Sequence, residues 1–412
     1  MLKKDNLIVG LDIGTTKICT IIGEVDNRGE IDIIGLGLSP SHGLRKGVVI
    51  DLESTVESIK RSVHEAETMS GTQVDSVYVG IAGGHIRGFN SRGVIAVMGK
   101  NREITQTDID RVIDAAKAVA LPMDREVIHI LPQEYIIDNQ DKIKRPLGMS
   151  GVRLEAEVHI VTGAVTSAQN LIKCANRAGL DVCDIILQPL ASSEAVLTSE
   201  ERNLGVALVD FGGGTTDMAI FSNGSISHTS VLALGGDNLT YDIAIGLRTP
   251  KLEAEKIKIK YGCALSSLIG KDETIEVPGV GGRKPRILSR QVLGEILEPR
   301  VEEIFSMVYS ELVRSGHESI ISSGIVLTGG SAELPGSIEL AEQIFNAPSR
   351  VGYPQLITGL VDVVNKPMYA TAVGLVIYGG KRSKKAKKFR IRDANIFNRV
   401  VRRMKKWFKD VI

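Results

Sequence analysis

The sequence predicts an α/β fold of two lobes, because one strand–turn–strand pattern occurs twice, about half the chain apart. One copy, Val9 to Lys17, reads V-G-L-D-I-G-T-T-K, and the other, Ala207 to Asp217, reads A-L-V-D-F-G-G-G-T-T-D. In each copy an apolar run typical of a buried strand ends in an aspartate, followed by glycine and two threonines. Two further apolar runs follow each copy, so each predicts a β-hairpin with a third strand. Internal duplication is more specific than either loop alone.

The turn of the second copy has the residue types that suit a phosphate. Consecutive glycines permit a sharp turn and leave backbone N–H groups uncovered, and such groups form a pocket for an anion. The threonine hydroxyls can donate to phosphate oxygens, and Asp210 stands where a hydrated magnesium could be held. A glycine-rich hairpin turn without a ligand is the alternative. The residues concerned are Gly212, Gly213, Gly214, Thr215 and Thr216.

The first copy offers a matching set, with Asp12 as its carboxylate. Two facing hairpins would clamp one polyphosphate, and each would direct one aspartate toward Mg²⁺, which commonly takes one or two carboxylates besides phosphate and water. The remaining residues of this loop are Gly14, Thr15, Thr16 and Lys17.

The pair of loops resembles phosphate 1 and phosphate 2 of the actin, Hsp70 and sugar-kinase superfamily. The stretch from Ile325 to Gly336 is similar to its adenosine motif, in which Gly329, Gly330 and Ser331 would lie against the nucleoside. Within the superfamily, essentially the whole chain resembles the FtsA family of bacterial division proteins. The resemblance implies a two-lobed actin-like ATPase fold with ATP and Mg²⁺ as cofactors and at most weak hydrolysis.

The resemblance also implies a domain organisation. We expect subdomain 1A at 1–84 and 166–199, an inserted α+β subdomain 1C at 85–165, subdomain 2A at 200–241 and 315–380, and subdomain 2B at 242–314. A basic linker at 381–394 and an amphipathic membrane-targeting helix at 395–412 would follow.

Further site candidates come from this resemblance. Gln188, at the start of a predicted helix, matches the family position that orients the attacking water, so Gln188, Asp12 and Asp210 are the catalytic candidates; a polar residue without a role is the alternative for Gln188. Near the sugar or phosphates we expect Gly235, Gly236 and Asn238. A Glu–Lys pair is expected at the ribose, with a solvated helix face as the alternative: Glu255 and Lys256.

The inserted segment offers no catalytic pattern. Thr107, before Asp108 and Asp110, indicates a helix start. Its three histidines are not spaced as metal ligands and are expected to be structural: His85, His129 and His159.

Composition limits the class of protein. The 412 residues are 43% hydrophobic and only 4% aromatic, which predicts two or more domains with aliphatic cores. The four cysteines show no metal spacing, and their pattern suits a reducing cytosol. The N-terminus does not read as a signal peptide, and no apolar run approaches the roughly 20 residues of a membrane span.

Charge is distributed unevenly. From residue 381 to the end there are fourteen Lys or Arg and two Asp, so a net charge of +1 for the chain leaves −11 on the first 380 residues. This asymmetry points to an anionic partner for the tail.

Residues 395–412 have the pattern of a helix that lies in a membrane surface. At about 100° per residue, the apolar side chains fall on one arc and six of the seven charged ones opposite it are basic. A helix for a calmodulin-like partner and a nucleic-acid arm are the alternatives, although nucleic acid would not need the apolar face. The predicted membrane residues are Ile396, Phe397, Val400, Val401, Met404, Trp407 and Phe408, with Arg402, Arg403, Lys405 and Lys406.

Together these features predict an ATP-binding protein that forms filaments on the cytoplasmic face of the membrane at the division septum. By resemblance it would tether the ring of the tubulin-like FtsZ, whose C-terminal tail would dock on a basic surface of 2B that includes Arg286, Arg290 and Arg300. Subdomain 1C would recruit later division proteins, and nucleic acid is not expected as a partner. A PilM-like pilus adaptor and a small-molecule kinase of the superfamily are the alternatives.

Overall fold

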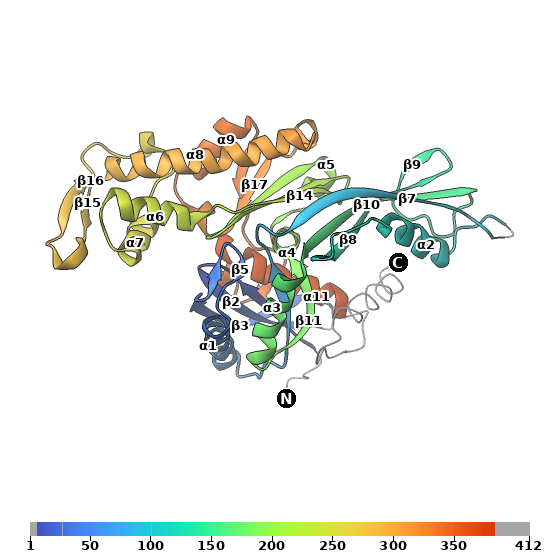
Figure 1. Cartoon of the computed structure of the whole chain (residues 1–412), viewed down its shortest axis with the longest axis horizontal. Helices are drawn as coiled ribbons and strands as arrows, with labels where there is room; N and C mark the ends of the chain where they lie inside the picture. Colours follow the sequence, from blue (N-terminus) through green and yellow to red (C-terminus); the bar gives the residue numbers. More distant parts are fainter. Residues whose placement is uncertain (1–5, 27, 100, 384–412) are drawn as a thin grey trace.

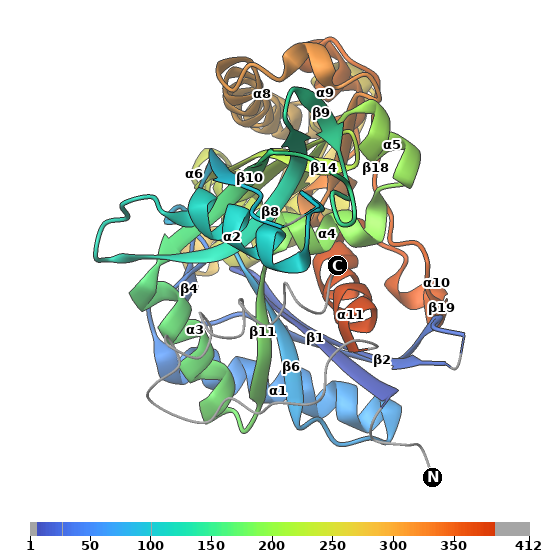
Figure 2. The same ribbon diagram turned by 90° about the vertical axis from the view of Figure 1, so that its right-hand side faces the viewer.

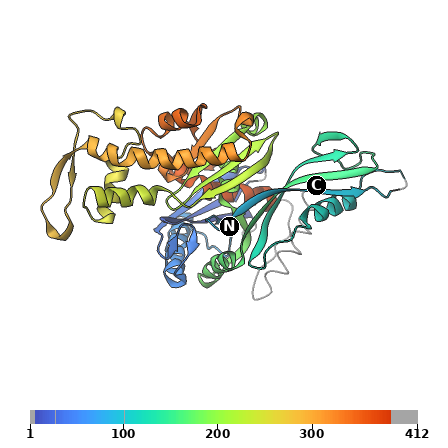
Figure 3. The same cartoon turned by 45° about the horizontal axis from the view of Figure 1, so that its top comes forward.

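The structure, a computed structural model, describes residues 6–26, 28–99 and 101–383. It has two lobes, each built on its own sheet, with an inserted subdomain at one end of the molecule and a helical extension of the second lobe at the other (Figures 1 and 3). Within the described ranges, no helix combines the length and apolar composition that a membrane span requires. The predicted helix at 395–412 and most of the predicted linker lie outside the described residues.

The first lobe is a six-stranded sheet with helices on both faces. Its strand order is β11-β6-β1-β2-β3-β19. Helices α1 (Leu52–Ser70) and α3 (Val165–Arg177) pack on one side and α11 (Ala370–Ser383) on the other (Figure 2). The strands are β1 (Leu7–Ile13), β2 (Lys17–Val25), β3 (Ile31–Pro40), β6 (Ser76–Ile81), β11 (Asp181–Leu187) and β19 (Thr358–Gly359).

Glycines in these strands let the helices lie close to the sheet. A Cβ at Gly37 would overlap the carbonyl oxygen of Ser62 in α1, and a Cβ at Gly10 would lie 2.5 Å from that of Ala372 in α11. Since a side chain at either position would force a helix away, these glycines fix the separation of the layers.

The second lobe repeats the hairpin of the first. Its sheet has the order β14-β13-β12-β17-β18. In the first lobe Gly14 N donates to Lys17 O at 3.0 Å, and in the second Gly212 N donates to Thr215 O at 3.0 Å, so the two turns match. The predicted duplication of the hairpins is therefore confirmed. The strands are β12 (Val206–Phe211), β13 (Thr216–Ser222), β14 (Ser225–Leu232), β17 (Ile325–Thr328) and β18 (Ser349–Val351), and α9 (Ser337–Phe345) packs beside β17 and β18.

Two helices connect the lobes. Helix α4 (Gln188–Val196) is crossed by α11, and a Cβ at Gly374 would overlap Ala191 O, so the two backbones touch. The small side chains of α4 make this approach possible: Ala191, Ser192, Ser193 and Ala195. Helix α5 (Ser199–Leu204), which the sequence analysis did not predict, leads from α4 into the second sheet.

The C-terminal part of the body differs from the expected boundaries. Residues 315–380 were assigned to subdomain 2A, but β19 pairs with β3 and α11 packs on β1 and β2 of the first lobe. Helix α11 also continues into the segment predicted as linker, because Lys381 is ion-paired with Glu194 and Arg382 with Asp184. A short helix, α10 (Val361–Val364), lies between β19 and α11.

The inserted subdomain is a four-stranded sheet covered by one helix. Its strand order is β7-β10-β8-β9. The elements are β7 (Arg87–Ala96), α2 (Gln106–Lys117), β8 (Arg125–Ile137), β9 (Gln140–Ile143) and β10 (Arg153–Ala164).

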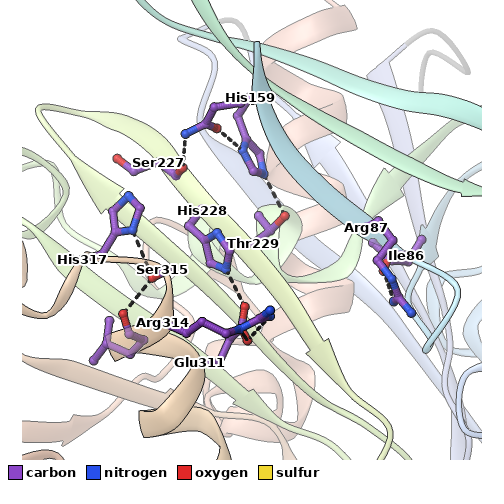
Figure 4. Close-up of polar contacts among 12 residues, drawn as sticks. Ile86, Arg87, His159, Ser227, His228, Thr229, Glu311, Arg314, Ser315 and His317 are labelled. Atoms are coloured by element: carbon purple, nitrogen blue, oxygen red, sulfur yellow. Dashed lines mark hydrogen bonds and ion pairs between the residues drawn. The ribbon is translucent and has the colours of Figure 1, made fainter. Parts of the chain in front are cut away.

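This subdomain bonds to both lobes. His129 Nε2 accepts a hydrogen bond from Leu187 N of the first lobe at 2.9 Å, and burial, together with the charge of Arg382, lowers the pKa of His129 to about 3. Gln133 Nε2 donates to Ile226 O of β14 at 2.9 Å. His159 Nε2 lies 2.8 Å from Thr229 Oγ1 of the same strand (Figure 4). The hydrogen bonds of His129 and His159 agree with the structural role predicted for them.

Helix α2 begins at a different residue from the one predicted. The N-cap is Thr105, whose hydroxyl accepts from Asp108 N while the Asp108 carboxylate accepts from Thr105 N. Thr107, the predicted start, lies inside the helix and is exposed. Asp108, at the third helical position, thus forms a reciprocal capping box with Thr105, three residues earlier.

We expect Thr105→Ala to destabilise α2 by about 1 kcal/mol, because the backbone N–H of Asp108 loses the hydroxyl that accepts its hydrogen bond. Thr107→Ala is the control and should change little, since exposed substitutions commonly stay within about 0.5 kcal/mol. Hydrogen exchange of the α2 amides measures both. Equal loss of protection in the two variants would contradict the assignment of the cap.

The extension of the second lobe consists of helices and one hairpin. The elements are α6 (Gly236–Gly246), α7 (Lys251–Tyr261), β15 (Thr274–Val277), β16 (Arg286–Ser289) and α8 (Arg290–Arg314).

The arginines predicted to bind a partner here are engaged within the chain. Arg286 donates to Leu247 O, Arg290 pairs with Glu273, and Arg300 pairs with Asp242 and Glu303. The sequence count of basic residues therefore overstates the positive charge that this surface presents.

Candidate functional site

The two predicted phosphate loops lie face to face between the lobes. A Cβ at Gly213 would lie 2.5 Å from the Thr16 side chain, and a Cβ at Gly214 would overlap that of Thr15. Thr15 Oγ1 also accepts a hydrogen bond from Gly47 N at 3.0 Å, which fixes that hydroxyl. Hairpins about 200 residues apart in the chain thus meet at their tips, as the duplication predicted.

Two further segments, the start of α6 and the turn after β17, lie against the second loop. Gly236 N donates to Gly212 O at 2.9 Å, and Asp237 N donates to Gly213 O at 2.7 Å. Ser331 Oγ donates to Gly212 O at 3.2 Å. The start of helix α6 and the turn after β17 are therefore both bonded to the backbone of the second loop.

The predicted adenosine turn lies beside the second aspartate. A Cβ at Gly329 would lie 2.5 Å from Asp210 Oδ1, and the positive φ of Gly329, 86°, also favours glycine. The next residue, Gly330, is exposed. The turn thus needs glycine at 329 for both space and backbone conformation.

The Asp12 carboxylate contacts one cationic side chain and one amide side chain. Lys17 Nζ lies 3.3 Å from Asp12 Oδ2, and Gln188 Nε2 donates to Asp12 Oδ1 at 3.0 Å. Burial by itself lowers the pKa of Lys17, but the charge and hydrogen bond of Asp12, together with the charges of Cys19 and Asp210, outweigh it and the pKa is raised. Lys17 is therefore a cation at neutral pH. Gln188, predicted from its place at the helix start, does reach the site and contacts one of the two candidate metal carboxylates.

Among the described residues, the side chains that hydrogen-bond to the Asp210 carboxylate are both hydroxyl groups. Ser192 Oγ donates to Asp210 Oδ2 at 2.6 Å, and Thr371 Oγ1 donates to the same oxygen at 3.2 Å. Burial raises the pKa of Asp210 above its ordinary range. A buried carboxylate held by neutral donors favours a nearby cation.

A third buried carboxyl lies next to Asp210. Asp217 faces Asp210 across the β12–β13 hairpin, and its Oδ2 accepts from Thr215 Oγ1 at 2.7 Å. Burial, followed by the charge of Asp210, raises the pKa of Asp217 to about 8, so it is mostly protonated at neutral pH. Its Oδ1 is buried without a hydrogen-bond partner among the described residues.

Three residues of α6 and α7 that were predicted to contact the nucleotide differ in their hydrogen bonds and exposure. Asn238 Oδ1 accepts from Gly235 N at 3.0 Å, so Asn238 caps helix α6. Glu255 lies 2.8 Å from Lys258 Nζ, which also donates to Gly236 O at 2.9 Å. Lys256 is exposed and pairs with Glu253, also on the surface of α7.

The lysine that reaches the site is thus Lys258 rather than the predicted Lys256. Side chains three apart share a helix face, whereas adjacent ones are separated by about 100°. The i, i+3 spacing from Glu255 was the available signal. Ser192, Thr371 and Asp217 were also missed as site residues; only Asp217, the last residue of the duplicated motif, left a sequence signal.

Two segments of the chain match models of known protein families. A family model described as "Cell division protein FtsA" matches residues 207–374, which run from the second hairpin to the first residues of α11. A second, described as "SHS2 domain inserted in FTSA", matches residues 83–162. That range corresponds to the inserted sheet and its covering helix.

Solved structures with a similar fold have low sequence identity. The PilM–PilN type IV pilus biogenesis complex aligns with a TM-score of 0.65 at 16% identity, over 90% of this chain and 98% of that one. MreB5 of Spiroplasma citri bound to ADP aligns with a TM-score of 0.56 at 16% identity, over 92% and 98%. These likenesses support the actin-like fold.

Curated relatives are much closer in sequence. The cell division protein FtsA of Pseudomonas aeruginosa is 56% identical over 373 residues, 90% of this chain and 89% of the relative. That of Escherichia coli K12 is 45% identical over 380 residues, 90% of each chain, and that of Borreliella burgdorferi is 44% identical over 406 residues, 98% of each. Since identity of this level extends over both lobes and the insertion, the chain belongs to the FtsA family of cell division proteins.

Proposed function

We propose that this division protein binds Mg–ATP between its lobes and forms filaments on the cytoplasmic face of the membrane at the septum. The observation that carries the nucleotide part is the meeting of four glycine-containing turns around two buried aspartates. These turns begin at Gly14, Gly212, Gly235 and Gly329.

The residues present fit a polyphosphate with a divalent cation. Side chains at Gly213, Gly235 and Gly236 would fill the space where the backbones meet, so glycine at these positions lets the turns lie against one another. Asp12 and Asp210 are the carboxylates that would hold hydrated Mg²⁺, and Lys17 would balance phosphate charge. Bound Mg²⁺ would supply charge stabilisation of the phosphates, and Gln188, beside Asp12, would orient water for slow hydrolysis.

Relatives of the same fold support a nucleotide. MreB5 of Spiroplasma citri has been solved bound to ADP and bound to AMPPNP. The small-molecule kinase and pilus alternatives lose support, because the extensive similarity is to cell division proteins and PilM shares only 16% identity.

The membrane and partner roles rest on sequence pattern and family. The apolar and basic faces predicted for residues 395–412 would hold the filament on anionic lipids. The C-terminal tail of FtsZ would dock on the second-lobe extension, where exposed Arg283 and Lys284, between β15 and β16, are the side chains that support binding of an acidic peptide. The inserted subdomain would recruit later division proteins.

Electron microscopy of the full chain on anionic lipid monolayers tests this function. We expect filaments with Mg–ATP and few without nucleotide, and an FtsZ tail peptide should bind the lipid-held protein. Absence of filaments at any nucleotide concentration would contradict the proposal, and a kinase screen would then follow.

Lys258 offers a test of the nucleotide pocket. Its ammonium group holds Gly236 O and Glu255, so Lys258→Met should loosen the turn beside the second loop and weaken ATP binding about tenfold. Lys256→Met is the matched control on the same helix and should change affinity less than about twofold, since surface ion pairs contribute little. Titration with a fluorescent ATP analogue measures both. Similar losses in both variants would contradict this placement.

A further inference from the structure

One short helix contacts both candidate metal carboxylates. Gln188 at the start of α4 donates to Asp12 of the first lobe, and Ser192, four residues later, donates to Asp210 of the second. Side chains at i and i+4 lie on the same helix face. The face of α4 toward the site therefore fixes one aspartate from each lobe in relation to the other.

The contacts to Asp210 form a closed hydroxyl network. Ser192 Oγ lies 2.6 Å from Asp210 Oδ2, 2.9 Å from Thr371 Oγ1 and 3.1 Å from Gln188 O. Thr371 Oγ1 lies 3.2 Å from the same Oδ2. Ser192 is fully buried and Thr371 is 7% exposed, so water has little access to compete.

The two hydroxyl protons limit which contacts in this network can be hydrogen bonds at the same time. Each hydroxyl has one proton to donate, and both can donate to Oδ2 when that oxygen carries no proton of its own. Ser192 then gives up its bond to Gln188 O in favour of the shorter contact to Asp210. The other carboxylate oxygen, Oδ1, lies against Gly329, where a Cβ has no room.

The crossing of α4 and α11 brings the two hydroxyls together. Gly374 lies against Ala191 O, and this backbone contact lets Thr371, one turn before Gly374, approach Ser192. The hydroxyls come from positions 179 residues apart in the chain. Neither helix alone could hold Asp210 in this way.

We propose that Ser192 and Thr371 are positioning residues that fix the Asp210 carboxylate for Mg²⁺ of the bound nucleotide. The proposal rests on the proposed function, since it requires Mg–ATP between the lobes. Hydrogen bonds to metal-binding carboxylates fix their orientation, and losing them commonly reduces metal affinity about tenfold to a hundredfold.

The test is the Mg²⁺ dependence of ATP binding by the full chain. A fluorescent ATP analogue is titrated first in EDTA and then at fixed nucleotide with increasing Mg²⁺. For Ser192→Ala and Thr371→Val we expect the half-saturating Mg²⁺ concentration to rise about tenfold or more, with Mg-free affinity within about twofold of wild type. Thr371→Ser keeps the hydroxyl and should restore the wild-type Mg²⁺ requirement.

Ser193→Ala is the matched control. Ser193 is the neighbouring buried serine on α4, and its hydroxyl donates to Leu190 O at 2.7 Å. It should leave the Mg²⁺ titration unchanged. A second readout without hydrolysis is the rise in Tm on adding Mg²⁺ at fixed ATP, which should shrink in Thr371→Val and return in Thr371→Ser.

The possible outcomes separate this proposal from the proposed function. An unchanged Mg²⁺ requirement in folded Ser192→Ala and Thr371→Val would overturn the positioning role, as would an equal loss of Mg-free and Mg-dependent binding. Failure of Thr371→Ser to restore the requirement would overturn it as well. If wild type bound no ATP under any condition, the proposed nucleotide function itself would be refuted.

Discussion

Asp210→Asn is expected to abolish most of the benefit that Mg²⁺ gives to ATP binding, weakening Mg–ATP affinity on the order of a hundredfold. The amide keeps the shape of the carboxyl group and can still accept from Ser192 and Thr371. It removes one negative charge from a buried site that also contains the Asp12 carboxylate. Because like charges repel the phosphates, Mg-free ATP should bind as well as to wild type or better.

This opposite response of two affinities distinguishes metal binding from general damage. Isothermal titration with ATP in EDTA and in excess Mg²⁺ measures both on one sample. Asp114→Ala, on the exposed face of α2, is the control and should change neither. Unchanged Mg–ATP affinity in Asp210→Asn would refute the assignment of Asp210 to the metal.

Replacing Trp407 and Phe408 together with alanine is expected to release the protein from anionic vesicles, with at least about a hundredfold weaker partitioning. Removing two aromatic side chains from an apolar interface forfeits about 3 kcal/mol or more. Lys409→Ala is the comparison on the opposite, basic face and should cost about 1 kcal/mol, an effect that added salt reduces.

Vesicle co-sedimentation with and without Mg–ATP measures these effects. The tail-free control should end after Ser383 and not after Gly380, because Lys381 and Arg382 make ion pairs with the body. Unaltered retention of the double alanine variant would sink the anchor. Tail-dependent binding to RNA in place of vesicles would favour the nucleic-acid alternative.

The features predictable from sequence were those encoded in contiguous residues. The two hairpins repeat one pattern of apolar, acidic and glycine residues, so their matching turns at Gly14 and Gly212 followed from local chemistry. Gln188 was identified because it matches the position at which the resembled family orients water, and it does reach Asp12.

Features that depend on exact helix phase were missed by a residue or two. The pairing partner of Glu255 is Lys258, three positions on, and the cap of α2 is Thr105, three before Asp108. In both cases the sequence prediction named a nearby residue of the same type instead, Lys256 or Thr107. Three-residue spacing on a helix, rather than adjacency, decides such contacts.

Apart from the facing hairpins, contacts between side chains of distant segments were not predicted. The Thr371 hydroxyl reaches Asp210 only because α11 crosses α4 and lies on the first sheet, a packing that local periodicity does not report. The pairing of Arg300 with Asp242 likewise depends on how α8 lies against α6. Counting arginines could therefore not reveal how much charge remains for a partner.

The inserted subdomain covers one edge of the second-lobe sheet. Strand β14 is at the edge of the second-lobe sheet, and its carbonyl groups at Ile226 and Ser227 accept from Gln133 and Asn90 of the insertion. Without the insertion, that edge would present unpaired backbone groups to any extended chain, and exposed edges of this kind template aggregation. The insertion thus covers the β14 edge, and we expect a variant that lacks it to need another means of blocking that edge.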